Sequence, residues 1–211
     1  RLLFLLIPAL ASAEKNTEQV LVTASRTPML LFENTSAITV ISSQELESRQ
    51  AVYVSDALRL TPGLAVSNSG GPSKNTQVRL RGAEGNHVMV LIDGIEVNDP
   101  AVGDEFDFAT LTTSNVERIE IVRGPQSALW GSDAVAGVIN IVTKDPNEGL
   151  QGGILVENGS YGTEHQNVNI ALGKSRYGFG VAFDHVESGG TNISRFGDED
   201  DGYEIFSANL K

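Results

Sequence analysis

The densest group of side chains that could bind a metal ion is a run of four acidic residues. Asp198, Glu199, Asp200 and Asp201 stand directly before Gly202 in the stretch FGDEDDGYE. Carboxylates gathered on a loop can bind calcium through their oxygens. The pattern favours the alternative, a solvated acidic loop that leads into a strand, and calcium is the second interpretation.

No set of residues in the sequence indicates catalysis. The histidines His87, His165 and His185 are scattered and follow no metal-ligand spacing, so each is expected to be structural. There is no cysteine, and no Ser-His-Asp arrangement, carboxylate pair or phosphate-binding loop stands out. Asp and Glu number 27 against 15 Lys and Arg, which argues against nucleic-acid binding. The sequence therefore predicts a protein that is not an enzyme and requires no cofactor.

The first residues resemble an export signal followed by a short leader. Residues 1–13, RLLFLLIPALASA, place an apolar run after a basic residue and end in an A-x-A cleavage pattern, so we expect a signal peptide that lacks its start. The leader covers residues 14–29. Within it, residues 20–22 form a β-prone run that looks too isolated to pair in a hairpin. The run is either the first strand of a sheet or a peptide that adds as a strand to a partner's sheet edge.

Residues 30–144 are expected to form one domain with a small sheet and short helices. Ser42 and Glu45 have the spacing of a capping box and predict a helix that ends near Arg49. A second helix, with Asp56 in its first turn, should end at the turn residues 61–63. Alternating or apolar runs predict strands at 37–42, 64–67, 76–82, 87–94, 116–124 and 136–144, of which 87–94 should be a central strand buried on both faces.

The sequence pattern changes after the turn-rich residues 145–149. Residues 150–211 contain four segments of roughly ten residues in which apolar and polar side chains alternate, with aromatic residues on the apolar face. This pattern predicts antiparallel strands of an outer-membrane β-barrel, and the alternative is a meander in a soluble sandwich. Four strands cannot close a barrel, so we expect the chain to be a fragment of a longer protein.

Three stretches together resemble the TonB-dependent receptors of the bacterial outer membrane. VLVTASR is similar to the TonB box, and RLRGAEGNHVMVLIDGIEVND and VERIEIVRGPQSALWGSDAVAGVINIVTK are similar to two motifs of the plug domain. Within that family the resemblance is greatest to the cobalamin transporters, although siderophore receptors share these motifs. The resemblance implies an α+β plug domain, a small mixed sheet with short helices, followed by the first antiparallel strands of a transmembrane β-barrel.

The resemblance also implies a function and its partners. A plug blocks the barrel, a scarce metal chelate binds at its outer face, and TonB pulls on the leader from the periplasm. The expected ligand is cobalamin, with a ferric siderophore or haem as the alternative, and the barrel contacts outer-membrane lipid. A signal-transducing receptor would need a further domain before residue 18, and a passive porin or adhesin would need neither plug nor TonB box, so both alternatives fit less well.

The resemblance assigns roles to individual residues. Two arginines, Arg81 and Arg123, are expected to meet carboxylates of the barrel wall. The small residues Gly131, Ala134, Ala136 and Gly137 are expected to allow close packing of the plug backbone. The residues expected to bind TonB are Glu18, Gln19, Val20, Leu21, Val22, Thr23 and Ala24. Those expected to bind substrate, in two loops of the plug, are Asn68, Ser69, Gly70, Gly71, Pro72, Ser73, Pro100, Ala101, Val102 and Gly103.

Overall fold

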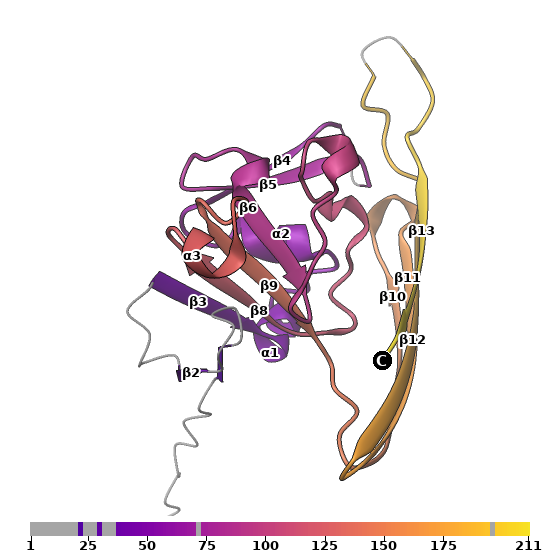
Figure 1. Cartoon of the computed structure of the whole chain (residues 1–211). Coiled ribbons are helices and arrows are strands. Elements are labelled where there is room, and N and C mark those ends of the chain that lie inside the picture. Colours follow the sequence, from indigo (N-terminus) through magenta and orange to yellow (C-terminus); the bar gives the residue numbers. More distant parts are fainter. Residues whose placement is uncertain (1–20, 23–28, 31–36, 71–72, 195–196) are drawn as a thin grey trace, which may run out of the picture.

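The computed structural model describes residues 21–22, 29–30, 37–70, 73–194 and 197–211. Most of these belong to two bodies, an N-terminal domain of residues 37–144 and a C-terminal sheet of residues 149–210. Figure 1 shows the sheet on edge, running along one side of the N-terminal domain. No helix in the described residues is long and apolar enough to cross a bilayer.

A five-stranded mixed sheet organises the N-terminal domain. Its strands lie in the order β3, β8, β9, β6 and β7, with β6 and β9 parallel and the other pairs antiparallel. The expected mixed sheet is therefore confirmed. β6 is an inner strand buried on both faces, as predicted, and β9 takes the middle position of the five. The strands are β3 (Ala37–Ser42), β6 (Val88–Ile92), β7 (Ile95–Glu96), β8 (Val116–Arg123) and β9 (Gly137–Thr143).

The central strand β9 is buried on both faces because side chains pack on each side of the sheet. Ile139 and Ile141 belong to the larger core cluster, which includes Phe108 and side chains from α2 (Val54–Arg59). Val138 faces the opposite way, into a smaller cluster with Met89 and Leu91. Each fully buried aliphatic side chain contributes about 1.5–3 kcal/mol of transfer free energy. Apolar residues on alternate sides therefore fix β9 in the middle of the domain.

The two expected helices form where their end signals predict. In α1 (Ser43–Ser48) the Ser42 hydroxyl accepts a hydrogen bond from the Glu45 amide, 3.3 Å away. This bond satisfies one of the amides that a helix N-terminus leaves without a partner. The second helix, α2, ends before the Pro62-Gly63 turn, and Gly63 has φ +84°. Four shorter helical turns follow: η2 (Gly85–His87), η3 (Pro100–Val102), η4 (Phe108–Thr110) and α3 (Ser127–Trp130).

The prediction of one sheet was incomplete, because β4 (Leu64–Asn68) and β5 (Thr76–Leu80) form a separate antiparallel pair. Val78 and Leu80 of β5 are buried in the larger core cluster, so this pair is held by side-chain packing while its backbone pairs only within itself. β4 also extends one residue further than predicted, so Asn68 ends a strand and does not lie in the loop.

The small residues of the stretch before β9 have different structural causes. A Cβ built on Gly137 would lie 2.2 Å from the Val122 carbonyl oxygen, so close packing excludes any side chain there. Ala134 is fully buried in the smaller cluster. At Gly131 the expectation of crowding was wrong, since a Cβ there would meet no atom within 4 Å. Gly131 instead has φ +89°, a conformation that disfavours other residues.

Four antiparallel strands, paired in chain order, make up the C-terminal sheet: β10 (Gly149–Asn158), β11 (Glu164–Lys174), β12 (Tyr177–Ser188) and β13 (Tyr203–Leu210). Its two faces differ as the alternation predicts. Alternate side chains such as Val168, Phe179 and Phe206 are exposed on one face. The face toward the N-terminal domain buries the polar residues His165 and Asp184, with others. The short turn η5 (Ser160–Gly162) joins β10 to β11.

The prediction that the run 20–22 is too isolated to pair was wrong. β1 (Leu21–Val22) pairs antiparallel with β2 (Met29–Leu30), with Leu21 opposite Leu30. The sequence reasoning failed because it considered only regular apolar runs as partners, and Met29-Leu30 is just two residues long. Residues 18–20 and 23–24 lie outside the described residues.

Candidate functional site

The predicted substrate loops lie at one end of the N-terminal domain. In the second loop, the Asp99 carboxylate accepts a hydrogen bond from the Ala101 amide at 2.8 Å and so begins η3. Gly103 ends this turn with φ +82°, and Val102 beside it is 62% exposed. In the first loop, the Ser69 amide donates to the Asn75 carbonyl at 2.9 Å. Ser73 has φ +62°, and Gly71 and Pro72 lie outside the described residues.

The connection between β12 and β13, residues 189–202, is described at 189–194 and 197–202, and these parts lie toward the same end of the molecule (Figure 1). A Cβ built on Gly70 would lie 3.4 Å from Cδ1 of Ile193 in this connection. The acidic run belongs to the same connection, and the Asp201 carboxylate accepts a hydrogen bond from the Ile193 amide at 3.1 Å. The structure therefore places one predicted substrate loop beside the acidic connection.

The four acidic residues do not converge as a metal site in the described part of the chain. One group of His and acidic ligand atoms does converge there, and it consists of His185, Glu187 and Glu204. Calcium binding at residues 198–201 therefore stays a prediction based on their spacing in sequence.

The two predicted wall-contacting arginines lie beside one another. A Cβ built on Gly63 would lie 3.6 Å from Nε of Arg123 and 4.0 Å from Cγ of Arg81. Partial burial, and then the charge of Arg81, lower the pKa of Arg123. Arg123 donates to the Pro62 carbonyl at 3.2 Å and to the Thr39 hydroxyl at 2.7 Å. In the described residues neither guanidinium forms an ion pair, so a carboxylate at this place would be stabilised by both.

A polar network joins the N-terminal domain to the inner face of the C-terminal sheet. His165 of β11 lies at its centre and is 3% exposed. Its Nε2 is 3.0 Å from Asp184 Oδ1 and 3.1 Å from the Ser114 hydroxyl, which belongs to the N-terminal domain. Its Nδ1 is 3.1 Å from Glu157 Oε2. The ring therefore connects two neighbouring strands to the domain that they face.

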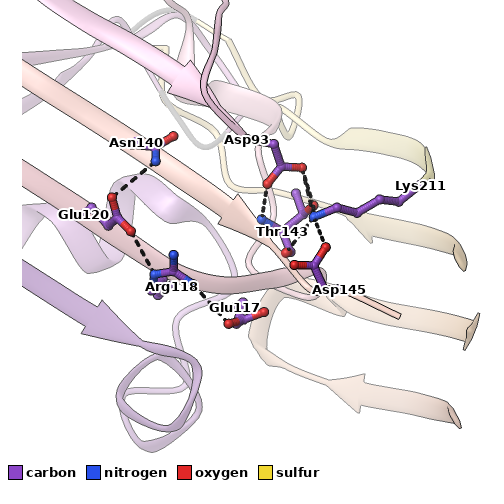
Figure 2. Close-up of polar contacts among 8 residues, drawn as sticks. All are labelled: Asp93, Glu117, Arg118, Glu120, Asn140, Thr143, Asp145 and Lys211. Carbon is purple, nitrogen blue, oxygen red and sulfur yellow. Dashed lines mark hydrogen bonds and ion pairs between the residues drawn. The ribbon is translucent and has the colours of Figure 1, made fainter. Parts of the chain in front are cut away.

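Two further contacts cross the same interface. Figure 2 shows Lys211, just after β13, reaching residues of the N-terminal domain: its Nζ lies 3.3 Å from Asp93 Oδ2 and 3.0 Å from the Thr143 hydroxyl. The Tyr53 hydroxyl donates to the Tyr203 hydroxyl at 3.2 Å. Burial, and then the hydrogen bond with Tyr203, raise the pKa of Tyr53 above its ordinary value of 10.0. These contacts join the two bodies through polar groups, beside apolar side chains such as Val186 that are buried on the same face of the sheet.

A cavity of about 430 Å³ lies between the two bodies, beside β10 and β11. Gln50, Thr113 and Lys144 line it from the N-terminal domain, and Glu157 and Asn169 line it from the sheet, together with several others. Its lining is mixed, because apolar side chains such as Leu46, Val52 and Leu155 line it beside these polar ones. The two bodies are therefore not packed tightly against one another at this place.

Sequence reasoning missed the residues that join the two bodies. His165 was assigned a structural role without a partner, and Asp184, Tyr53 and Lys211 were not singled out. The alternation in β11 and β12 indicated the face on which His165 and Asp184 lie. Their partner Ser114 is distant in sequence, and no local pattern identifies such a pair.

Three comparisons with known proteins agree with this architecture. The family model of the TonB-dependent Receptor Plug Domain matches residues 31–138. The vitamin B12 transporter BtuB of Vibrio vulnificus (strain CMCP6) is 39% identical over 145 residues, which are 69% of this chain and 23% of that protein. The chain thus spans less than a quarter of the length of that relative.

Solved structures show the same fold. The ferric yersiniabactin uptake receptor FyuA from Yersinia pestis matches with a TM-score of 0.65 at 24% identity, over 84% of this chain and 28% of that one. The ferripyoverdine receptor of the outer membrane of Pseudomonas aeruginosa matches with a TM-score of 0.68 at 18% identity, over 82% and 23%. The chain belongs to the TonB-dependent receptors, and its N-terminal domain is their plug.

Proposed function

We propose that this chain supplies the plug and the first four wall strands of a receptor that imports cobalamin across the bacterial outer membrane. The observation that carries the proposal is the packing of the plug, with polar contacts, on the inner face of a sheet whose outer face is apolar over most of its length. Exposed side chains such as Ile170, Phe179 and Phe183 suit contact with lipid. The identity to a vitamin B12 transporter favours cobalamin as the ligand.

The polar interface suits a plug that must move. Contacts such as Ser114 with His165 and Lys211 with Asp93 can be exchanged for water when the plug rearranges, because hydrogen bonds to water replace them. An interface built from buried apolar side chains would resist the same movement more strongly.

Coupling to TonB would use the leader, residues 14–29. In the described residues β1 pairs only with β2, so the second edge of Leu21–Val22 is open for a strand of TonB. Strand addition needs such an edge, since the backbone supplies its hydrogen bonds. Figure 1 shows β2 at the end of the plug away from β4 and β5, which fits access from the periplasm.

Arg81 and Arg123 would meet carboxylates of later wall strands, and the loops at residues 68–73 and 100–103 would contact the ligand. The first loop lies beside the acidic connection 189–202, where Gly70 approaches Ile193, and this supports a joint binding surface of plug and wall. Calcium bound by residues 198–201 would order this connection. No catalytic role is proposed.

A ferric siderophore is the second candidate ligand, with haem beside it. FyuA and the ferripyoverdine receptor are receptors of this kind, and their similarity to this chain is one of fold. The discriminating experiment expresses the receptor at full length from its gene and measures binding of cyanocobalamin against ferric siderophores. Tight siderophore binding without cobalamin binding would reject cobalamin.

A second experiment tests the coupling. Deletion of residues 18–24 should abolish uptake of the bound ligand and spare binding at the cell surface. Uptake at the wild-type rate after this deletion would show that the leader does not couple the receptor to TonB.

A further inference from the structure

Three glutamates stand side by side on the outer face of the C-terminal sheet. Glu164 of β11 is paired in register with Glu187 of β12, and Glu187 with Glu204 of β13. All three are exposed and lie near the ends of their strands next to the connection 189–202. We call this set the glutamate row.

Such a row is unfavourable without a cation. Like charges directly opposite one another on neighbouring strands destabilise a sheet. In the described residues no lysine or arginine forms an ion pair with any of the three. The single recorded partner is the imidazole of His185, whose Nε2 lies 3.1 Å from Glu204 Oε1. The row therefore presents unbalanced negative charge at a fixed place on the sheet.

His185 completes a set of converging ligand atoms. One ligand atom from each of His185, Glu187 and Glu204 lies within 4.8 Å of the others. The imidazole stacks on the Phe206 ring, with centroids 4.3 Å apart and an angle of 13° between the planes, so its orientation is held. Around a tetrahedral ion with bonds of about 2.1 Å, ligand atoms lie about 3.4 Å apart, so small rotations of the glutamates would close the site.

We propose that His185, Glu187 and Glu204 bind a divalent transition-metal ion, for which Zn²⁺ is the best match. One imidazole nitrogen with two carboxylate oxygens is a ligand set that zinc accepts, with a fourth position left for water or another anion. Calcium and magnesium prefer oxygen ligands alone, so the imidazole argues against them. The ion would neutralise part of the glutamate row and tie β12 to β13 at the base of their connection.

The position on the sheet makes the site reachable from water, a point that rests on the proposed function. Ten residues separate Tyr177 from Glu187 in β12, or about 34 Å along the strand. With a strand tilt of about 45°, this is about 24 Å across the membrane, which matches the apolar band of about 25 Å. The site then lies at the outer edge of the lipid-facing surface, above the aromatic residues of that face.

The test titrates the full-length receptor in detergent with Zn²⁺, measured by competition with a chromophoric chelator, and repeats it with Co²⁺ to record the visible spectrum. We compare the wild type with His185→Gln and Glu204→Gln, and use His87→Gln as the matched control because His87 lies in the plug. Each site variant is expected to weaken the binding of one Zn²⁺ at least about tenfold, and the control to leave it unchanged.

Equal zinc stoichiometry and affinity in the wild type and both site variants would overturn the site, as would calcium competing with Zn²⁺ at equal concentration. Circular dichroism of each variant confirms that a loss of binding is not a loss of folding. Cobalamin binding and the presence of the receptor in outer-membrane fractions are measured on the same strains. If the receptor binds zinc but does not bind cobalamin or is absent from the outer-membrane fraction, the proposed function is rejected and the metal site is retained.

Discussion

Replacing Gly137 with alanine tests the closest approach in the plug. A Cβ at this position would lie 2.2 Å from the Val122 carbonyl oxygen and 2.5 Å from Cδ2 of Leu80. The glycine also has φ +155°, which residues with a side chain rarely adopt. Gly137 is paired both with Arg123 of β8 and with Val88 of β6. A shift of the β9 backbone at this residue therefore disturbs the strand pairing on both sides.

The expected loss has two parts. The backbone conformation costs about 1–3 kcal/mol for a residue other than glycine. Overpacking of a filled core costs about 1–3 kcal/mol more. Together they give about 2–6 kcal/mol, which is large against the 5–15 kcal/mol that stabilises a typical domain. Each 1.4 kcal/mol changes an equilibrium constant about tenfold, so a loss of about 2 kcal/mol should accelerate amide exchange of β8 and β9 at least about 30-fold.

The assay is hydrogen exchange of the full-length receptor, followed by mass spectrometry of peptides from β8 and β9. Gly131→Ala is the matched control, because Gly131 also has a positive φ but meets no atom within 4 Å. It lies outside both strands and should leave their exchange close to the wild-type rate. If Gly137→Ala exchanged no faster than this control, the close approach would not constrain the sheet, and the reasoning would be refuted.

Three other perturbations concern polar contacts. Glu120→Ala removes a fully buried carboxylate that lies 2.8 Å from the Arg118 guanidinium. Glu117→Ala removes a second carboxylate that pairs with the same guanidinium but is 45% exposed (Figure 2). In denaturant titrations of the receptor, we expect Glu120→Ala to lower the free energy of unfolding by about 3–5 kcal/mol and Glu117→Ala to lower it by less than about 1 kcal/mol. Lys211→Met should weaken the contact between plug and sheet by about 1–3 kcal/mol, seen as faster exchange of the peptide that contains Asp93. Tyr53 should give no tyrosinate absorbance at its ordinary pKa of 10.0, and the stability that its neutral form provides is fully present below pH 10 and lost as the pH rises through the raised pKa.

Each of these has its own control. Equal losses for the two glutamate variants would show that burial does not decide the strength of the ion pair. Lys174→Met changes an exposed lysine at the end of β11 and should leave the Asp93 peptide unchanged. For Tyr53, the absorbance difference between the wild type and Tyr53→Phe is compared with that for the exposed Tyr161→Phe. A full tyrosinate signal from Tyr53 near pH 10 would contradict the raised pKa and the partial burial that causes it.

Local signals predicted the elements of the plug well, because each depends on neighbours in sequence. Ser42 and Glu45 mark the start of α1 through one hydrogen bond three residues apart. The alternation in β11 and β12 assigned Phe179 and Phe183 to the outer face through strand geometry alone. The same reasoning failed for Met29-Leu30, since two residues carry no period that could reveal a strand.

By itself the sequence determined which family the chain resembles, the approximate place of its longer strands, and which face of the C-terminal strands is apolar. Only the tertiary structure decided that β9 is central, that β4 and β5 form their own sheet, and that Arg81 lies beside Arg123. It alone brought His165 to Ser114 and set Glu187 between two other glutamates. The physical reason is that register and packing join residues far apart in the chain, whereas propensity and period act within a few residues of one another.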